Sequence, residues 1–229
     1  MRFSERLAKA TEADRAYLET APVIQRSLRG EIDRPTYIEF LTQAYHHVRH
    51  TVPLLMAVGA RLPERLDWLR SEVIHYVNEE VGHEQWILAD IANAGGDAER
   101  ARLSRPAAPT AAMVACAYDT VQRGNPVGFF GMVHVLEGTS VALALAAAER
   151  IQQSLGLPKN AFTYLRSHGE LDQEHVQHLG KILDRLEEEA DREAIVDCAR
   201  GVYWLYAEMF RGPDARPAAQ ERASVRRLA

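Results

Sequence analysis

Cysteine is scarce in this chain, long apolar runs are absent, and positive charge is not in excess. Only Cys116 and Cys198 occur among 229 residues, and neither belongs to a C-x-x-C pair, so a disulfide framework or a thiolate zinc site is not expected. No stretch approaches the ~18 consecutive apolar residues of a membrane span. The charged N-terminus contains no apolar run typical of a secretory signal. We therefore predict no membrane span and a cytoplasmic location.

The charge balance bears on the class of partner. The chain has 27 basic and 32 acidic residues, for a net charge of −5. A nucleic-acid-binding protein needs a basic face that neutralises phosphates, so this class is not expected. With 47% hydrophobic residues, the length is typical of one globular domain. We place this domain at residues 1–210 and expect residues 211–229 to form a flexible tail.

Apolar residues recur at helical spacing along nearly the whole chain, and alternation with a period of two is rare. This pattern predicts an all-α protein. Pro35 stands where a first helical position is plausible, Gly95-Gly96 marks a stop, and Thr110 is a candidate N-cap. We expect a short helical turn near 22–29 and about seven helices, near 3–20, 35–61, 64–93, 111–123, 126–155, 159–189 and 191–210.

Ionisable residues interrupt the apolar, inward-facing positions of three of these helices. Each interruption lies in the middle of the helix, where a bundle would normally place leucine or valine, and apolar residues flank it on both sides. The interrupting residues are Glu80 and His83 in the predicted helix 64–93, Glu137 in the segment after Pro126, and His168, Asp172 and His175 in the segment after Pro158.

Three carboxylates and three imidazoles in one core are costly unless their charge is compensated. The inward-facing positions contain no lysine or arginine. Two divalent cations would compensate directly, and iron or manganese suits a mixture of imidazole and carboxylate ligands. Glu80-x-x-His83 and Asp172-x-x-His175 each place a carboxylate beside an imidazole, the spacing used in di-iron helical bundles.

Other interpretations of these residues remain open at this point. Glu80 and His83 could lie on a solvated face, since Asn78, Glu79 and Glu84 are close by. The three residues of the segment after Pro158 could form a metal-free hydrogen-bond network. Glu137 could be a buried acid that is bonded to a tyrosine or a histidine.

At these residues the sequence resembles the haem-oxygenase-like di-iron oxidases, which share a fold with thiaminase II and pyrroloquinoline-quinone synthase. The resemblance covers roughly residues 5–210. It depends on Asn78-Glu79-Glu80-Val81-Gly82-His83, on Glu137 and, most specifically, on His168-x-x-x-Asp172-x-x-His175. It implies that Glu80, His83, Glu137, His168, Asp172 and His175 bind two irons. Glu80 is preferred to Glu79 because it fits the inward-facing positions.

The resemblance also implies an activity. Members of this family bind ferrous iron, often with a weakly held second ion, and activate O₂. They catalyse N-oxygenation, desaturation or oxidative C–C cleavage of amino-acid-like or fatty-acid-like substrates. They require no haem and are commonly homodimers. We expect the same here: an O₂-dependent oxidoreductase with two Fe(II) per subunit, a homodimer, and a small, partly hydrophobic substrate.

Two further histidines are candidates for catalytic roles. His47 stands among apolar residues of the predicted helix 35–61, where it could contact the substrate or be an ordinary core histidine. His134 lies one turn before Glu137 and could orient it, or could serve packing alone.

Several other functions, and one other fold, are alternatives for this sequence. An oxidase without metal would line its pocket with histidines and arginines, and a thiaminase-like hydrolase would need a nucleophilic cysteine there. A non-enzymatic helical interaction protein is a third possibility. A ferritin-like bundle would need a fourth metal-facing carboxylate, for which the helix at 37–58 offers only Glu39.

Overall fold

The computed structural model describes residues 1–212, apart from the side chains of residues 170–173. Within this part, all regular structure is helical, and no strand occurs. Short 3-10 turns lie at Glu64–Leu66 (η1), Pro126–Gly128 (η2) and Lys159–Ala161 (η3). The α-helices are α1 Phe3–Ala10, α2 Glu12–Glu19, α3 Pro22–Arg29, α4 Arg34–Val48, α5 Thr51–Arg61, α6 Asp67–Glu80, α7 His83–Asn93, α8 Ala98–Leu103, α9 Ala108–Gln122, α10 Phe129–Leu155, α11 Thr163–Asp184 and α12 Glu189–Arg211.

The fold class is confirmed, but the predicted number of about seven helices is too low. The segments 3–20, 35–61 and 64–93 each divide into two helices, and α8 was not predicted. In the last of these segments, Gly82 adopts a φ of 92°, a left-handed conformation that ends one helix before the next begins. Thr110 is not an N-cap: α9 begins at Ala108, and the buried Thr110 hydroxyl donates to Oε1 of Gln43 at 2.7 Å. The predicted tail from residue 213 onward lies outside the described residues.

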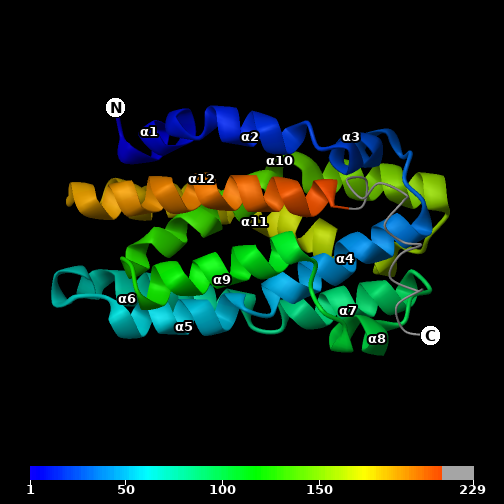
Figure 1. The fold of residues 1–229 in the computed structure, drawn as a ribbon, viewed down its shortest axis with the longest axis horizontal. Helices are drawn as coiled ribbons and strands as arrows, with labels where there is room; N and C mark the ends of the chain where they lie inside the picture. Colours follow the sequence, from blue (N-terminus) through cyan, green and yellow to red (C-terminus); the bar gives the residue numbers. More distant parts are fainter. Residues whose placement is uncertain (213–229) are drawn as a thin grey trace, which may run out of the picture.

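Helix α10 is the central helix of an elongated bundle. Helices α3, α11 and α12 pack against it, with α1–α3 along one edge and α4–α9 along the other (Figure 1). The segment Pro126–Leu155 is long and apolar enough in composition to cross a membrane. A core helix surrounded by other helices has the same composition, and the packing around α10 accounts for its apolar character here.

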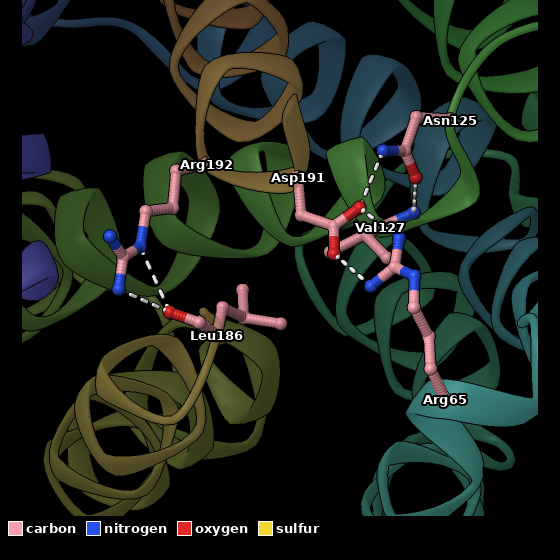
Figure 2. A network of polar contacts seen from close by, with 6 residues as sticks. All are labelled: Arg65, Asn125, Val127, Leu186, Asp191 and Arg192. Atoms are coloured by element: carbon pink, nitrogen blue, oxygen red, sulfur yellow. Dashed lines mark hydrogen bonds and ion pairs between the residues drawn. The ribbon is translucent and has the colours of Figure 1, made fainter. Parts of the chain in front are cut away.

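Helix α12 is tied to the rest of the bundle by a polar network at its N-terminus (Figure 2). The Arg65 guanidinium donates to both carboxylate oxygens of the fully buried Asp191, at 2.6 and 3.0 Å. The Asn125 amide donates to the same carboxylate at 2.8 Å. Bidentate, charge-assisted bonds of this kind offset the cost of burying the acid. They hold α12, η1 and the turn before α10 together.

A second buried acid positions the helix that carries the histidines. Asp90 of α7 is fully buried, and its carboxylate accepts the backbone N–H groups of Thr163 and Tyr164 at 3.0 and 2.8 Å. These are orphan donors in the first turn of α11, so Asp90 caps this helix from outside. The cap fixes the start of α11 against α7.

Candidate metal centre and cavity

The sequence predicted Glu80 and His83 on one face of a continuous helix. The structure places them on two helices instead. Glu80 ends α6 and His83 begins α7, with the left-handed Gly82 between them. The break keeps the pair together: Nδ1 of His83 lies 3.1 Å from Oε2 of Glu80. Their side chains are only 4% and 12% exposed, so the alternative of a solvated face is wrong.

His168 of α11 joins this pair. Ligand atoms of Glu80, His83 and His168 all lie within 4.8 Å of one another, and the two imidazole rings are 4.8 Å apart at 76°. Nδ1 of His168 is 3.0 Å from the carbonyl oxygen of Tyr164. Because a carbonyl only accepts, this contact places the proton on Nδ1, so that Nε2 is the nitrogen that would bind a metal.

The ring of Trp86 stacks on His83, with centroids 4.0 Å apart and an angle of 28° between the planes. Tyr164 lies against His168, with ring centroids 4.5 Å apart. These aromatics restrict the rotation of both imidazoles. We refer to Glu80, His83 and His168 as the first metal position.

A second pair of predicted ligands lies close by. Nδ1 of His175 is 3.8 Å from Oε1 of Glu137, and both side chains are 8% exposed. On its other side, Nε2 of His175 is 3.2 Å from Oε2 of Glu79. The side chain of Asp172, the remaining predicted ligand, lies outside the described residues. We refer to Glu137 and His175 as the second metal position, after the role that the sequence predicts for them.

The charges of these groups fit a cation. Burial would raise the pKa of the Glu80 carboxyl, but the hydrogen bond from His83 and the nearby imidazoles His168 and His175 outweigh burial and lower this pKa. In the described part of the chain, no lysine or arginine lines the adjoining cavity. One carboxylate and two imidazoles that converge beside this cavity form a donor set that suits ferrous iron.

The cavity beside these residues has a volume of about 130 Å³. Its lining includes Glu80, Glu137 and His168, and along α10 it extends from Phe129 to Ile151. At ~1.5 Å per helical residue, these positions span some six turns, with Glu137 near the middle. Most of the other lining side chains are apolar, so the cavity follows α10 and is largely apolar around the predicted ligands.

His47 and His168 are the two histidines in the described lining of this cavity. His47 is 1% exposed, and neither of its ring nitrogens has a hydrogen-bond partner among the described residues. Burial, reinforced by the nearby His168, lowers the pKa of His47 to about 3. The imidazole is therefore neutral and has one donor and one acceptor available.

His134 lies elsewhere. Its ring is edge-on to Tyr203 of α12, with centroids 6.4 Å apart, and it is not among the cavity-lining residues described. Burial, together with the charge of Arg15, lowers its pKa to about 4. Its predicted role of orienting Glu137 stays a prediction.

The stacking of Trp86 on His83 was not predicted from the sequence. From the sequence, Glu79 and Glu80 were alternative ligands, whereas in the structure Glu79 contacts His175 and Glu80 contacts His83. The stacking could have been anticipated from the spacing, since Trp86 follows His83 by three residues and shares its helix face. Nothing local in the sequence pairs Glu79 with His175, which is 96 positions away.

The fold is similar to those of several known structures. The chain superposes with a TM-score of 0.81 and 22% identity on a domain of unknown function with a haem-oxygenase-like fold from Shewanella denitrificans OS217, covering 100% of this chain and 96% of that one. For a TenA homologue from P. horikoshii OT3, the TM-score is 0.71 at 14% identity, covering 93% and 100% of the two chains. For haem oxygenase-1 from the cyanobacterium Synechocystis sp. PCC6803 in complex with haem, it is 0.72 at 14% identity, covering 99% of each.

These likenesses define the class of protein as all-α with the haem oxygenase and TenA fold. The ferritin-like alternative is thereby excluded. At the level of sequence, the model of a family of iron-containing redox enzymes matches residues 38–207. The chain belongs to this family, which confirms the predicted relationship and supports a redox function. None of the curated proteins compared matches the sequence.

Proposed function

We propose that this protein is a non-haem di-iron oxidase that uses O₂ to oxidise a small, partly hydrophobic metabolite. The observation that carries the proposal is the convergence of Glu80, His83 and His168 beside an apolar cavity, with all ligand atoms within 4.8 Å. These three residues would bind the first iron. Glu137, His175 and Asp172 would bind the second iron. Nδ1 of His175 and Oε1 of Glu137 are 3.8 Å apart, which is too far for a hydrogen bond between them but suits two ligands of one cation.

Bound ferrous iron would supply the electrons and the open coordination positions needed to reduce O₂. The chain's own contribution is orientation and exclusion of water. The Tyr164 carbonyl selects the tautomer of His168, Trp86 holds the plane of His83, and apolar side chains of α3, α5 and α10 close the space around them. Manganese would find the same donors acceptable.

The substrate would lie along α10. The long apolar lining favours an extended hydrophobic part such as an acyl chain or the side chain of an apolar amino acid. His47 would bind a polar group of this molecule, because a buried imidazole without a protein partner costs free energy that a ligand's hydrogen bond recovers. N-oxygenation, desaturation and oxidative C–C cleavage are the reactions expected at such a site.

The competing enzymatic functions find less support. A metal-free oxidase would use arginines in the pocket, and in the described part of the chain none lines the cavity. A thiaminase-like hydrolase needs a reactive thiol, but Cys116 is exposed and burial raises the pKa of Cys198 to about 11. Neither cysteine is among the described cavity-lining residues. Besides O₂ and the substrate, we propose a second copy of the chain as partner in a homodimer.

The first test is reconstitution with Fe(II) without oxygen, followed by metal analysis and exposure to O₂. We expect about two irons per chain and a transient, O₂-dependent absorbance. The substitutions His168→Ala and Glu137→Gln should each abolish the transient, because each removes a ligand of one metal position, while the helical circular dichroism stays unchanged.

Glu149→Gln is the matched control for Glu137→Gln, because Glu149 lies on the exposed side of the same helix three turns later. This variant should behave as the unmodified protein does. A transient of full amplitude in both ligand variants would contradict the proposal. Once iron is in place, a screen of amino-acid-like and acyl-chain compounds for O₂ consumption addresses the substrate.

A further inference from the structure

Glu79 of α6 makes contact with a histidine that the proposed function assigns to the second iron. Its Oε2 lies 3.2 Å from Nε2 of His175 on α11, within ion-pair distance although the two groups are not aligned as a hydrogen bond. The exposed fractions of the two side chains are 32% and 8%, so Glu79 lies at the outer rim of the site and His175 inside it. Two sequence neighbours therefore face different imidazoles, because Glu80 contacts His83 instead.

We propose that Glu79 is a positioning residue whose negative charge beside Nε2 keeps the proton of His175 on that nitrogen, so that Nδ1 faces the second metal. A neutral imidazole carries its proton on one nitrogen only, and a carboxylate beside Nε2 favours the proton there. The lone pair then lies on Nδ1, the nitrogen on the side of Glu137. Carboxylates hold metal-bound histidines in this way at many metal sites. This inference depends on the proposed function.

The opposite side of the His175 ring agrees with this assignment. Nδ1 is 3.8 Å from Oε1 of Glu137. Two ligands on one cation, each bound at about 2.1 Å, reach this separation when the angle between the bonds is wide. A metal thus fits between Nδ1 and Glu137, whereas Nε2 faces Glu79.

The carboxylate of Glu79 is itself anchored on the solvent side. Its Oε1 lies 3.2 Å from Nε2 of His75, whose side chain is 51% exposed. With one oxygen toward each histidine, the carboxylate bridges the surface and the second metal position. Its place directly before Glu80, at the end of α6 and beside the Gly82 break, gives both metal positions a common support.

A parallel contact between the same two helices provides the matched control. Two turns earlier on α6, Oε2 of Glu72 lies 2.9 Å from Nε2 of His178, also on α11. His178 is not a predicted ligand. Variants at Glu72 therefore disturb an equivalent link between the helices without acting on His175.

Two measurements on Glu79→Ala, Glu79→Gln and Glu72→Ala test the proposal. The first is made on the metal-free protein: long-range ¹H–¹⁵N spectra of labelled histidines report the tautomer of each ring. His175 should be Nε2-protonated in the unmodified protein and lose this preference in Glu79→Ala only. The second is an anaerobic Fe(II) titration. Glu79→Ala should keep the first equivalent and bind the second about 10–100-fold more weakly, and Glu72→Ala should bind both as the unmodified protein does.

Glu79→Gln separates positioning from direct ligation. Its side-chain oxygen, which carries partial negative charge, can still accept from Nε2–H, so the second equivalent should be restored most of the way to the affinity of the unmodified protein. Equal loss in Glu79→Gln and Glu79→Ala would show that the carboxylate binds metal, and would overturn the proposal. An Nδ1-protonated His175 would also overturn it. Fewer than two irons in the unmodified protein would instead contradict the proposed function, while the tautomer measurement would still decide the role of Glu79.

Discussion

At the scale of single residues, the histidines of this protein differ in how their ring nitrogens are held. His168 donates to a backbone carbonyl, His83 contacts a carboxylate and stacks on Trp86, and His47 has no hydrogen-bond partner in the described part of the chain. In the function we propose, the same side chain would thus serve as a metal ligand in the first two cases and as a contact for substrate in the third. These roles follow from the groups around each ring, since the imidazole is chemically identical in all of them.

His134 leads to a prediction about pH. Its pKa is about 4 in the folded protein and about 6.5 when unfolded. As the pH falls from 6.5 toward 4, the unfolded state takes up a proton that the folded state does not, so stability is lost in this window and is fully present above it. The loss is at most about 3 kcal/mol by linkage.

The measurement is urea unfolding of the metal-free protein at a series of pH values. In His134→Gln, the part of the decline that depends on this residue should vanish, so the slopes of the two curves should differ between pH 6.5 and 4 and agree above this window. Parallel curves for the variant and the unmodified protein would show that His134 titrates normally in the folded state.

At the scale of elements, two glycines of α10 differ in the space around them. A Cβ on Gly131 would collide with the backbone of α12 at the Ile195 carbonyl and would lie 2.7 Å from the Ala199 nitrogen. Close helix packing is therefore the reason for this glycine. A Cβ on Gly138 would meet no described atom within 4 Å, so no contact among the described residues accounts for its place in the helix.

The two positions predict opposite effects of alanine. Gly131→Ala should lower the free energy of unfolding by roughly 1–3 kcal/mol, because α12 must move outward. Gly138→Ala should raise it by up to about 1 kcal/mol, because alanine has the higher helix propensity. Urea unfolding midpoints of both variants are the measurement, and a destabilised Gly138→Ala would reveal a contact or a ligand that needs this space.

At the scale of the whole molecule, the predicted ligands come from three distant parts of the chain. Residues 80–83 join α6 to α7, Glu137 is in the central helix, and residues 168–175 are in α11. Metal bound to all of them would link these parts across the bundle. Because a ligand that binds only the folded state stabilises it, metal binding and folding should be coupled.

We therefore predict that Fe(II), added without oxygen, raises the melting temperature of the metal-free protein. At a concentration 100-fold above the dissociation constant, the gain is about 2.7 kcal/mol, or roughly 5–10 °C for a chain of this size. The double variant His168→Ala/His175→Ala should show no rise. The same rise in this variant would place the metal elsewhere.

The sequence by itself determined the helical class and most of the predicted site, because helical periodicity and a three- or four-residue spacing are local properties. The ionisable residues among apolar ones identified Glu80, His83, Glu137, His168 and His175, all of which the structure places in the same region. The helix breaks were harder to predict. The break at Gly82 depends on one backbone conformation, which glycine permits but does not require.

Only the tertiary structure decided which residues meet. The pairing of Glu79 with His175, the cap that Asp90 provides for α11, and the tautomer of His168 depend on where helices pack or on which group faces a ring nitrogen. Such contacts join positions tens of residues apart or depend on side-chain orientation, and neither leaves a periodic signal in the chain. The physical reason is that spacing along a helix determines which side chains share a face, whereas the packing of helices determines what that face contacts.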